Sequence, residues 1–587
     1  MKTIYNRGVK NENTRRICIM ARNILGENSP KLKRPNSIKH LMEIAVSEAG
    51  EKIAYKYRTG EGVREVSYKE FQTETFWLGT ALASMGMASG HIGCAAENSY
   101  NWILVYLTAL QSEGVFCPID KELIEGDLIN VVHGGDDEIV FCDKKREENF
   151  RAIREQLPNV KYFVCFDREE DDGEFLSFKK LFAKGKELYE NGDRSYCNMC
   201  TKDIKALKML IYTSGTTGLA KGVMLSEHNL ISLVHYGLKL ASIREVGLSV
   251  LPYHHSYEAV AGILVALHRH ATLCINDSLK RVVKNLALYK PGYMYVVPAL
   301  MEVLYRRMWA SIEEKGKTKT IKIAIKLSRF LRAIGIDVRR KLFKELHNAL
   351  GGNLVKLICG GAPLRAEIAD FFDDIGIIVT NGYGITECSP LVSVNTDFIN
   401  DPKTVGLPME CVEIRIDDPN EDDEGEICVK GDIVMLGYYK NEAATAEVFT
   451  EDGFFRTGDY GKVNKKGQIL ITGRKKNIII LGNGKNIYPE ELEDYIGGIP
   501  YVLENVVYAY RDEDGSEAAL AVQCSVDPEL LEKEGKEALE AKLKHDVFAA
   551  LAKLPTYKQV TKVIIRETPF VITSSKKIRR AKDGSPM

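Results

Sequence analysis

The stretch YTSGTTGLAKG, residues 212–222, combines three glycines with four Ser or Thr side chains and one lysine. Glycines let the backbone turn sharply and bring N–H groups close to an anion, hydroxyls can donate to phosphate oxygens, and the lysine adds a positive charge. The pattern predicts a phosphate-binding loop that follows a strand and precedes a helix. The residues expected to contact phosphate are Thr213, Ser214, Gly215, Thr216, Thr217, Gly218 and Lys221.

This loop differs from a Walker A loop, which would have Gly directly before the lysine and Ser or Thr directly after it. Ala220 and Gly222 occupy those two positions. An ordinary flexible turn rich in Gly and Thr is the alternative interpretation, and the density of donors together with Lys221 favours a phosphate site. We expect a strand at 208–212 before the loop and a helix capped by Ser226 after it.

Length and charge limit the class of protein. The chain has 587 residues, and domains of about 100–200 residues predict two to four structural units. Its 80 basic and 81 acidic side chains give a formal net charge of −1, which argues against a protein that coats nucleic acid. We therefore expect no nucleic-acid partner.

Targeting and redox features of the sequence indicate the cytoplasm. No stretch reaches the roughly 18–20 apolar residues that cross a membrane, and the polar, basic segment 1–26 lacks the apolar part of a secretory signal. Thirteen cysteines, an odd number with irregular spacing, favour reduced thiols over a disulfide framework. These features predict a cytoplasmic protein. They are also compatible with a peripheral contact at the inner membrane surface.

The order of predicted elements indicates an α/β protein. In the N-terminal part, predicted helices at 71–87 and 105–114 alternate with short apolar strands such as 138–142 and 161–165. This alternation is typical of a doubly wound parallel sheet. Residues 405–472 carry short strand-like runs, which predict a small barrel or sheet.

The C-terminal part has a different pattern. Strands at 502–510 and 518–526 and a Glu/Lys-rich helix at 529–553 predict a separate α+β unit. The sequence therefore predicts a large domain at 1–475 and a smaller domain at 476–587.

Residues 311–350 are strongly basic, and apolar residues recur among them at near-helical spacing. A basic amphipathic helix of this kind can lie on an anionic membrane, here through 315–345. A solvated helix that packs on its own domain is the alternative. The basic residues are Lys315, Lys317, Lys319, Lys322, Lys326, Arg329, Arg332, Arg339, Arg340, Lys341 and Lys344.

The loop at 212–222 resembles the phosphate-binding loop of the adenylate-forming superfamily, which comprises acyl-CoA synthetases, peptide-synthetase adenylation domains and luciferases. Further motifs recur in the family's order and cover nearly the whole chain. The resemblance implies a large N-terminal domain of doubly wound sheets plus a small β-barrel, followed by a smaller mobile α+β domain. Residues 305–350 resemble an insertion seen in long-chain fatty acyl-CoA synthetases.

Two segments resemble the acyl and adenine sites of this family. LPYHHSY, residues 251–257, is similar to the segment at the mouth of the acyl site, and the resemblance implies that His255 lies near the substrate carboxylate. CGGAPL, residues 359–364, resembles the loop beside adenine, where Gly allows the backbone to approach a flat base closely. The residues implied in this loop are Gly360, Gly361 and Ala362.

NGYGITE, residues 381–387, resembles the segment that holds adenine and Mg²⁺. Tyr383 offers an aromatic face to the base, Thr386 a hydroxyl to phosphate, and Glu387 a hard oxygen ligand to Mg²⁺. The resemblance implies nucleotide contacts from this segment at Asn381, Gly382, Tyr383 and Gly384.

Further matches lie toward the C-terminus. Asp459 resembles the aspartate that holds the ribose hydroxyls, and Arg474 resembles the second ribose or phosphate contact. Lys476 matches the hinge position, and 484–493 resembles the loop that meets the thiol in the second half-reaction. The alternative for the last segment is a helix that begins at a proline and carries acidic residues in its first turn.

The adenylation lysine is implied near the C-terminus. Many family members carry a Gly-Lys pair there, and the alignment implies Lys577 as the catalytic lysine. Lys576 stands where Gly is usual and is a rival for the role. A solvated basic tail is the alternative.

The resemblance implies a ligase that uses ATP, Mg²⁺ and CoA. A carboxylic acid attacks the α-phosphate of ATP, pyrophosphate leaves, and a thiol then displaces AMP from the acyl-adenylate. The resemblance of 305–350 to the insertion of long-chain fatty acyl-CoA synthetases implies a fatty acid, preferably a long-chain one, as the substrate. No carboxylate follows His255 before Glu258 to pair with an amino acid, which argues against an amino-acid adenylating domain and favours free CoA as the thiol. Two alternatives stay open: a ligase that loads a carrier protein, and a catalytically silent nucleotide or acyl binder.

Overall fold

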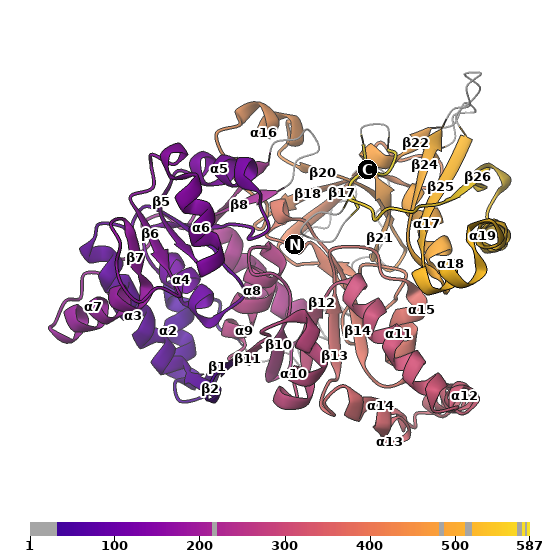
Figure 1. The fold of residues 1–587 in the computed structure, drawn as a ribbon, viewed down its shortest axis with the longest axis horizontal. Helices are drawn as coiled ribbons and strands as arrows, with labels where there is room; N and C mark the ends of the chain where they lie inside the picture. The colour runs from indigo at the N-terminus through magenta and orange to yellow at the C-terminus, as the bar shows by residue number, and fades with distance from the viewer. Residues whose placement is uncertain (1–31, 214–219, 481–485, 511–518, 572–577, 582–583) are drawn as a thin grey trace. The chain divides into compact units, whose positions relative to one another are not determined.

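The computed structural model describes residues 32–213, 220–480, 486–510, 519–571, 578–581 and 584–587 (Figure 1). The chain divides into two compact units. The large unit contains the described residues up to Ile414 together with 429–455 and 465–469, and the C-terminal unit contains 415–428, 456–464 and the described residues from Leu470 onward.

The first sheet of the large unit is mainly parallel. Its strand order is β19-β9-β8-β4-β3-β5-β6-β7, and only β9 runs antiparallel to its neighbours. The strands are β3 (His91–Ala95), β4 (Val115–Pro118), β5 (Asp137–Cys142), β6 (Tyr162–Cys165), β7 (Phe175–Ser177), β8 (Leu207–Thr213), β9 (Lys221–Ser226) and β19 (Gly437–Tyr438).

The second sheet of the large unit has a parallel centre with antiparallel edges. Its strand order is β16-β15-β14-β13-β12-β10-β11-β1-β2, and the run from β14 to β1 is parallel. The strands are β1 (Ile53–Thr59), β2 (Gly62–Ser67), β10 (Val246–Ser249), β11 (Thr272–Ile275), β12 (Tyr293–Val296), β13 (Lys356–Cys359), β14 (Ile378–Tyr383), β15 (Ser393–Val394) and β16 (Leu407–Pro408).

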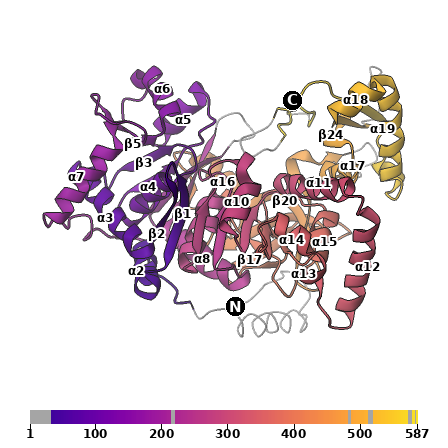
Figure 2. The same cartoon turned by 60° about the horizontal axis from the view of Figure 1, so that its bottom comes forward.

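Helices cover both sheets (Figures 1 and 2). Those of the large unit are α2 (Ile38–Ala49), α3 (Tyr68–Ser84), α4 (Tyr100–Gln111), α5 (Glu125–Gly134), α6 (Lys144–Ala152), α7 (Phe178–Glu190), α8 (Glu227–Leu240), α9 (Val265–His268), α10 (Val282–Tyr289), α11 (Pro298–Glu314), α12 (Thr318–Ala333), α13 (Arg339–Leu342), α14 (Lys344–Ala349), α15 (Ala366–Asp374) and α16 (Glu442–Val448).

Local sequence signals explain several of these elements. Ser67 and Ser99 accept hydrogen bonds from the first turns of α3 and α4, which fixes where the two helices begin. Trp102 on α4 is fully buried and packs against Phe116 of β4 at 5.2 Å between ring centroids. Burying a side chain such as Phe116 contributes roughly 2–3 kcal/mol. The predicted α/β alternation is therefore confirmed, with helix starts three to five residues earlier than expected.

The C-terminal unit contains two main sheets. Most of the sheet β17-β18-β20-β21 belongs to it, and a further sheet has the order β24-β25-β26. Closure of the first sheet into a barrel stays a prediction. The elements are β17 (Val412–Asp417), β18 (Gly425–Gly431), β20 (Phe455–Val463), β21 (Ile469–Arg474), β22 (Ile479–Ile480), β23 (Asn486–Ile487), β24 (Val502–Tyr510), β25 (Ala519–Val526), β26 (Lys562–Ile565), α17 (Pro489–Gly497), α18 (Pro528–Glu534) and α19 (Lys536–Leu551).

The prediction of a single helix at 529–553 is wrong, because two helices, α18 and α19, occupy this range. Gly535 has φ of +79°, a left-handed conformation that ends α18 and lets α19 start in a new direction. Leu539, Leu543 and Val547 on α19 are fully buried against the sheet of this unit. The domain boundary at 475/476 stays a prediction.

Among the described residues, every helix is too short or too polar to serve as a membrane span.

Candidate active site

The predicted nucleotide segments lie at the carboxyl ends of two neighbouring strands of the second sheet. β13 and β14 are parallel, and Cys359 lies opposite Asn381 in their register. Gly360 therefore comes directly beside Gly382, and a Cβ atom placed on Gly360 would lie 3.5 Å from the Gly382 carbonyl oxygen. The carboxyl ends of parallel strands are where α/β proteins bind ligands. The structure brings the two segments together as the sequence predicts.

Glycine is required at two positions of these segments. Gly361 has φ of +86°, and together with Ala362 it is exposed, so its backbone is accessible to a ligand. A Cβ atom on Gly384 would lie 1.7 Å from the Pro390 carbonyl oxygen, so a larger residue does not fit there. Tyr383 is buried, and its carbonyl oxygen accepts a hydrogen bond from the Val392 N–H at 2.8 Å.

Thr386 and Glu387 lie on a short 3₁₀ helix, η4 (Thr386–Cys388), directly after this strand. The Ser256 and Thr386 hydroxyl oxygens are 3.3 Å apart. The Tyr438 hydroxyl donates to Glu387 Oε1 at 3.0 Å, and the Glu387 carbonyl oxygen accepts from the Met435 N–H at 2.9 Å. The Glu387 side chain is thus held by a tyrosine from the other sheet.

The predicted acyl-site segment lies against these nucleotide segments. Tyr257 donates from its hydroxyl to the Ile358 carbonyl oxygen at 2.9 Å, and the same hydroxyl would lie 3.3 Å from a Cβ on Gly360. With the Ser256–Thr386 contact, this places the segment that carries His255 beside both nucleotide motifs. The His255 ring lies 4.2 Å from the ring of its neighbour His254.

His254 is buried in this segment. Its Nε2 lies 3.4 Å from Asp120 Oδ1. Burial lowers the pKa of His254 to about 3, and the neighbouring His255 acts in the same direction, against the opposing effect of Asp120. His254 is therefore uncharged at neutral pH, and the role of His255 near the substrate carboxylate stays a prediction.

The phosphate loop connects two strands, β8 and β9, and the predicted helix follows the second of them. β8 and β9 form an antiparallel pair in which Thr213 lies opposite Lys221. The helix α8 begins only after β9, and Ser226 caps it as predicted, in a capping box with Asn229. The Lys221 ammonium lies 4.9 Å from the centre of the Tyr438 ring. Ser214, Gly215, Thr216, Thr217 and Gly218 lie outside the described residues.

Two residues that organise this site were given no role by the sequence: Ser256, which lies in the predicted acyl-site segment, and Tyr438, which lies in no predicted motif. Tyr438 contacts both the base of the phosphate loop and Glu387, although it lies 51 residues from Glu387 and 217 from Lys221. Ser256 is 130 residues from Thr386. No local pattern indicates such contacts, because they depend on how the two sheets are packed.

The predicted ribose residues lie in the C-terminal unit. Asp459 is 3% exposed, and its Oδ1 lies 2.8 Å from Arg474 Nε. Burial lowers the pKa of Lys476, and the nearby Arg474 acts in the same direction. The ribose and hinge roles stay predictions. Lys576, Lys577 and residues 484–485 lie outside the described residues.

A family profile decides the relationship of this chain to known proteins. The profile described as AMP-binding enzyme matches residues 42–439, more than half of the 587 residues. The chain belongs to the AMP-binding enzyme family. This family is part of the adenylate-forming superfamily, so the resemblance noted in the sequence is confirmed.

Curated relatives of this AMP-binding enzyme are acyl-CoA ligases. Long-chain-fatty-acid–CoA ligase FadD15 of Mycobacterium tuberculosis is 34% identical over 342 residues, which cover 55% of each chain. Long-chain-fatty-acid–CoA ligase 5 of Rattus norvegicus is 27% identical over 495 residues, which cover 79% of this chain and 72% of the relative. The match thus spans about half the length of the first of these relatives.

Solved structures show the same fold. The anthranilate CoA ligase AuaEII in complex with anthranoyl-AMP gives a TM-score of 0.75 at 17% identity, covering 93% of this chain and 96% of that one. The adenylation domain of a carboxylate reductase from Mycobacterium chelonae gives 0.76 at 21% identity, covering 97% and 95%. The mixed α/β fold class predicted from the sequence is therefore confirmed.

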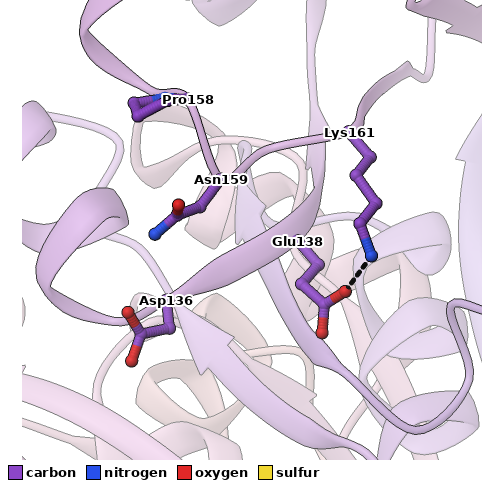
Figure 3. Close-up of a pocket in the computed structure, with 5 residues that line it drawn as sticks. All are labelled: Asp136, Glu138, Pro158, Asn159 and Lys161. Carbon is purple, nitrogen blue, oxygen red and sulfur yellow. Dashed lines mark hydrogen bonds and ion pairs between the residues drawn. The ribbon is translucent and has the colours of Figure 1, made fainter.

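A surface pocket lies on the first sheet of the large unit. Asp136, Glu138, Pro158, Asn159 and Lys161 line it, and Lys161 Nζ pairs with Glu138 Oε2 at 2.5 Å (Figure 3). None of these residues belongs to the motifs of the family. The pocket therefore does not represent the nucleotide site.

Proposed function

We propose that this AMP-binding enzyme is an ATP-dependent acyl-CoA ligase for fatty acids. The carboxylate attacks the α-phosphate of ATP and releases pyrophosphate, and the CoA thiol then attacks the acyl carbon and releases AMP. The observation that carries the proposal is the convergence of Gly360, Gly382, Thr386 and Tyr257 at the carboxyl ends of β13 and β14. The names of the curated relatives support the same activity.

The donor set of the large unit fits a magnesium ion that is held mainly by substrate. No cluster of three or more His, Cys, Asp or Glu side chains suited to a metal is found among the described residues. Mg²⁺ in phosphoryl-transfer enzymes typically takes one or two carboxylates and completes its shell with phosphate oxygens and water. Glu387 would supply the carboxylate, and the ion would neutralise charge on the triphosphate.

The chain's own residues would position the reacting groups. Gly360, Gly361 and Tyr383 would hold adenine, and Thr386 would donate to a phosphate oxygen. The loop 213–222 would bind the pyrophosphate part of ATP through backbone N–H groups, hydroxyls and Lys221. Because substitution at phosphorus depends mostly on positioning and charge, these contacts would supply most of the rate enhancement.

The C-terminal unit would act in both half-reactions. In our proposal Asp459 and Arg474 hold the ribose, and Lys577 balances the charge that grows on the α-phosphate and carboxylate oxygens during adenylation. A rotation about Lys476 would then withdraw Lys577 and bring the loop 484–493 to the acyl-adenylate. Lys576 remains the rival for the lysine role.

The experiment that tests the proposal measures acid-dependent pyrophosphate release by the purified full chain. A panel of fatty acids from short to long is offered with and without CoA. We expect release with long-chain acids and formation of the acyl-CoA only when CoA is present. A ligase that loads a carrier protein would stop at the adenylate even with CoA, and a silent binder would bind ATP without releasing pyrophosphate.

We also propose that the enzyme is cytoplasmic and that it contacts an anionic membrane surface through α12. Ile323, Leu327, Phe330 and Ile334 follow one another at steps of four, three and four residues, which places them on one face of a helix. Their exposed fractions are 67%, 49%, 64% and 59%. Such a stripe is unusual on a surface exposed only to water.

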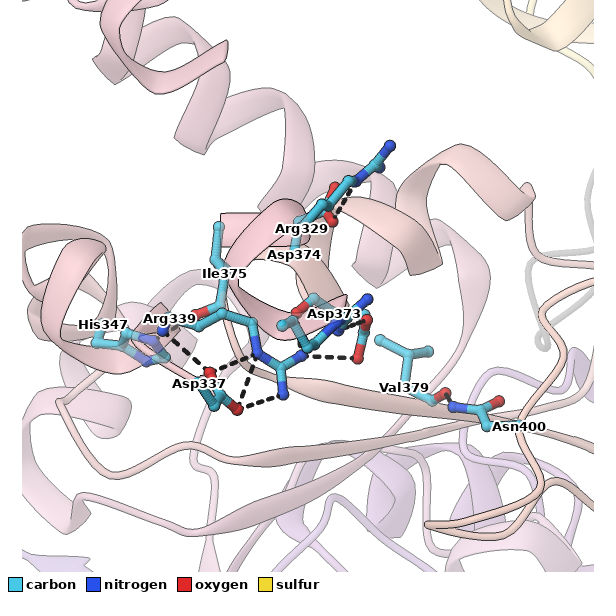
Figure 4. Close-up of polar contacts among 10 residues, drawn as sticks. Arg329, Asp337, Arg339, His347, Asp373, Asp374, Ile375, Val379 and Asn400 are labelled. Atoms are coloured by element: carbon cyan, nitrogen blue, oxygen red, sulfur yellow. Dashed lines mark hydrogen bonds and ion pairs between the residues drawn. The ribbon is translucent and has the colours of Figure 1, made fainter. Parts of the chain in front are cut away.

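The opposite face of α12 is tied to its own unit by ion pairs. Arg329 Nη2 lies 2.5 Å from Asp374 Oδ2 (Figure 4). Arg332 Nη1 lies 2.5 Å from Asp373 Oδ2. Arg339, after the helix, also pairs with Asp373. These contacts hold α12 against α15 and leave the apolar stripe on the outside.

Lysines accompany the apolar stripe. Lys319, Lys322 and Lys326 lie on α12, and none of them has an ion pair recorded within the described part of the chain. A lysine close to an anionic leaflet contributes about 1 kcal/mol of binding. The combination of an apolar stripe with lysines therefore matches a lipid surface that bears negative charge.

Sedimentation of the full chain with lipid vesicles tests this contact. We expect co-sedimentation with phosphatidylcholine vesicles only when they contain phosphatidylglycerol, and weaker binding at high salt. The double variant Leu327→Glu and Phe330→Glu should lose binding. Ile124→Glu is the matched control, because Ile124 is also exposed, at 73%, and lies far from α12 in sequence. If both variants bind the vesicles equally well, α12 is a solvated helix that does not contact the membrane.

A further inference from the structure

Glu258 is a buried acidic residue for which the proposed chemistry has no role. It is 1% exposed and lies in the first turn of the π-helix η2 (Tyr257–Leu264). The Ser249 hydroxyl oxygen lies 2.5 Å from Glu258 Oε1, whereas Oε2 is buried and has no hydrogen-bond partner among the described residues. A charged carboxylate left in this state would be very unfavourable.

The surroundings of Glu258 favour its uncharged form. The titratable groups near it are the hydroxyls of Tyr253, Tyr257, Tyr293 and Tyr295. No cation is recorded as its partner in the described part of the chain. Burial raises the pKa of Glu258 to about 8, although the hydrogen bond with Ser249 acts in the opposite direction.

The packing around the carboxyl group is specific. A Cβ atom on Gly262 would lie 2.8 Å from Glu258 Cδ, so glycine is needed one turn further along the helix. π-Helices are rare and occur frequently at functional sites, where the extra residue re-aims side chains. Here the wide turn and Gly262 together make room for the buried Glu258 carboxyl group.

Glu258 connects the end of a strand to the segment that carries His255. Ser249 is the last residue of β10, so its contact fixes Glu258 to the second sheet. The N–H groups of Glu258 and Ala259 both donate to the His255 carbonyl oxygen, at 3.2 and 3.0 Å. The residues between them, Ser256 and Tyr257, make the contacts to Thr386 and Ile358 described above.

We propose that Glu258 is a positioning residue whose uncharged carboxyl group, bound to Ser249, holds His255, Ser256 and Tyr257 in register with Thr386 and Gly360. The proposal rests on the proposed ligase function for its kinetic consequence. A displacement of about 1 Å at a reacting group can cost on the order of a hundredfold in rate. Glu258 would thus set the rate of adenylation without touching the substrate.

Two variants and a matched control test the role in the full chain. Glu258→Gln keeps the shape and the uncharged state, and its kcat for pyrophosphate release should stay within about threefold of the parent value. Glu258→Leu removes the contact with Ser249, and its kcat should fall by roughly a hundredfold. Glu227→Leu is the control, because Glu227 is equally buried at 1% but binds the Ile38 N–H instead. It should lower stability and leave kcat within about threefold.

The pH profile distinguishes this role from a purely structural one. In the parent protein kcat should fall as pH rises above about 8, because Glu258 then ionises. Glu258→Gln cannot ionise there and should lose this alkaline limb. A profile with the same alkaline limb in both proteins, or equal losses in Glu258→Gln and Glu258→Leu, would overturn the proposal.

Infrared spectroscopy provides a test that does not depend on activity. The difference spectrum between the parent chain and Glu258→Gln at pH 7 should contain the carbonyl band of a protonated carboxylic acid. A carboxylate band in its place contradicts the proposal, whatever the kinetics show. If the parent chain releases no pyrophosphate with any acid, the proposed ligase function fails, and the infrared band still decides whether Glu258 is uncharged.

Discussion

At the scale of single residues, Gly384 is the most constrained position of the nucleotide segments. Because a Cβ atom there would lie 1.7 Å from the Pro390 carbonyl oxygen, Gly384→Ala forces one backbone segment to move. We expect it to lower the free energy of unfolding by about 3 kcal/mol, measured by urea denaturation. Gly126→Ala is the control, since nothing lies within 4 Å of a Cβ at Gly126. Equal stability of the two variants would contradict the geometry.

A second prediction for a single residue concerns His254, whose burial should make the stability of the protein depend on pH. Its folded pKa of about 3 lies below the ordinary value of 6.5, so the unfolded chain binds a proton that the folded chain does not. His254 therefore does not lower the free energy of unfolding above pH 6.5, and it lowers that free energy progressively as pH falls toward 3. At pH 5 the cost is about 2 kcal/mol. His254→Gln should reduce the drop in Tm between pH 7.5 and pH 5, and an unchanged drop would exclude His254 as its source.

At the scale of elements, β19 links the phosphate loop to the proposed metal ligand. Tyr438 holds its ring beside Lys221 and donates its hydroxyl to Glu387. Tyr438→Phe keeps the ring and removes the donor, so the Mg²⁺ concentration needed for half-maximal pyrophosphate release should rise about tenfold. Tyr439→Phe is the matched control, because the Tyr439 hydroxyl donates to Asp136 instead. The same Mg²⁺ requirement in both variants would argue against Glu387 as ligand.

At the scale of the whole molecule, the proposed cycle requires the C-terminal unit to adopt two arrangements. Lys476 lies in the 3₁₀ helix η5 (Lys475–Asn477), where the fixed φ of proline is compatible with the backbone. Lys476→Pro should therefore retain acid-dependent pyrophosphate release and slow acyl-CoA formation by roughly tenfold. Lys476→Ala, which leaves the backbone free, should retain both steps. Loss of both steps in Lys476→Pro would show that residue 476 is not the hinge.

The sequence by itself determined most of the local elements and predicted the candidate site residues. Regular spacing of apolar residues predicted the helices now seen as α3 and α4, and short apolar runs predicted β5 and β6. The glycine-rich motifs could be recognised because backbone conformation and ligand chemistry restrict the residues allowed at each of their positions. Such signals are encoded within a few neighbouring residues.

Only the tertiary structure decided which distant residues meet. The sequence did not show that β9 separates the phosphate loop from α8, that Tyr438 holds Glu387, or that Glu258 is buried with one oxygen unpartnered. It also did not show which face of α12 packs against α15. These features depend on strand order and on the packing of helices against sheets, which join residues that are far apart along the chain and leave no local pattern.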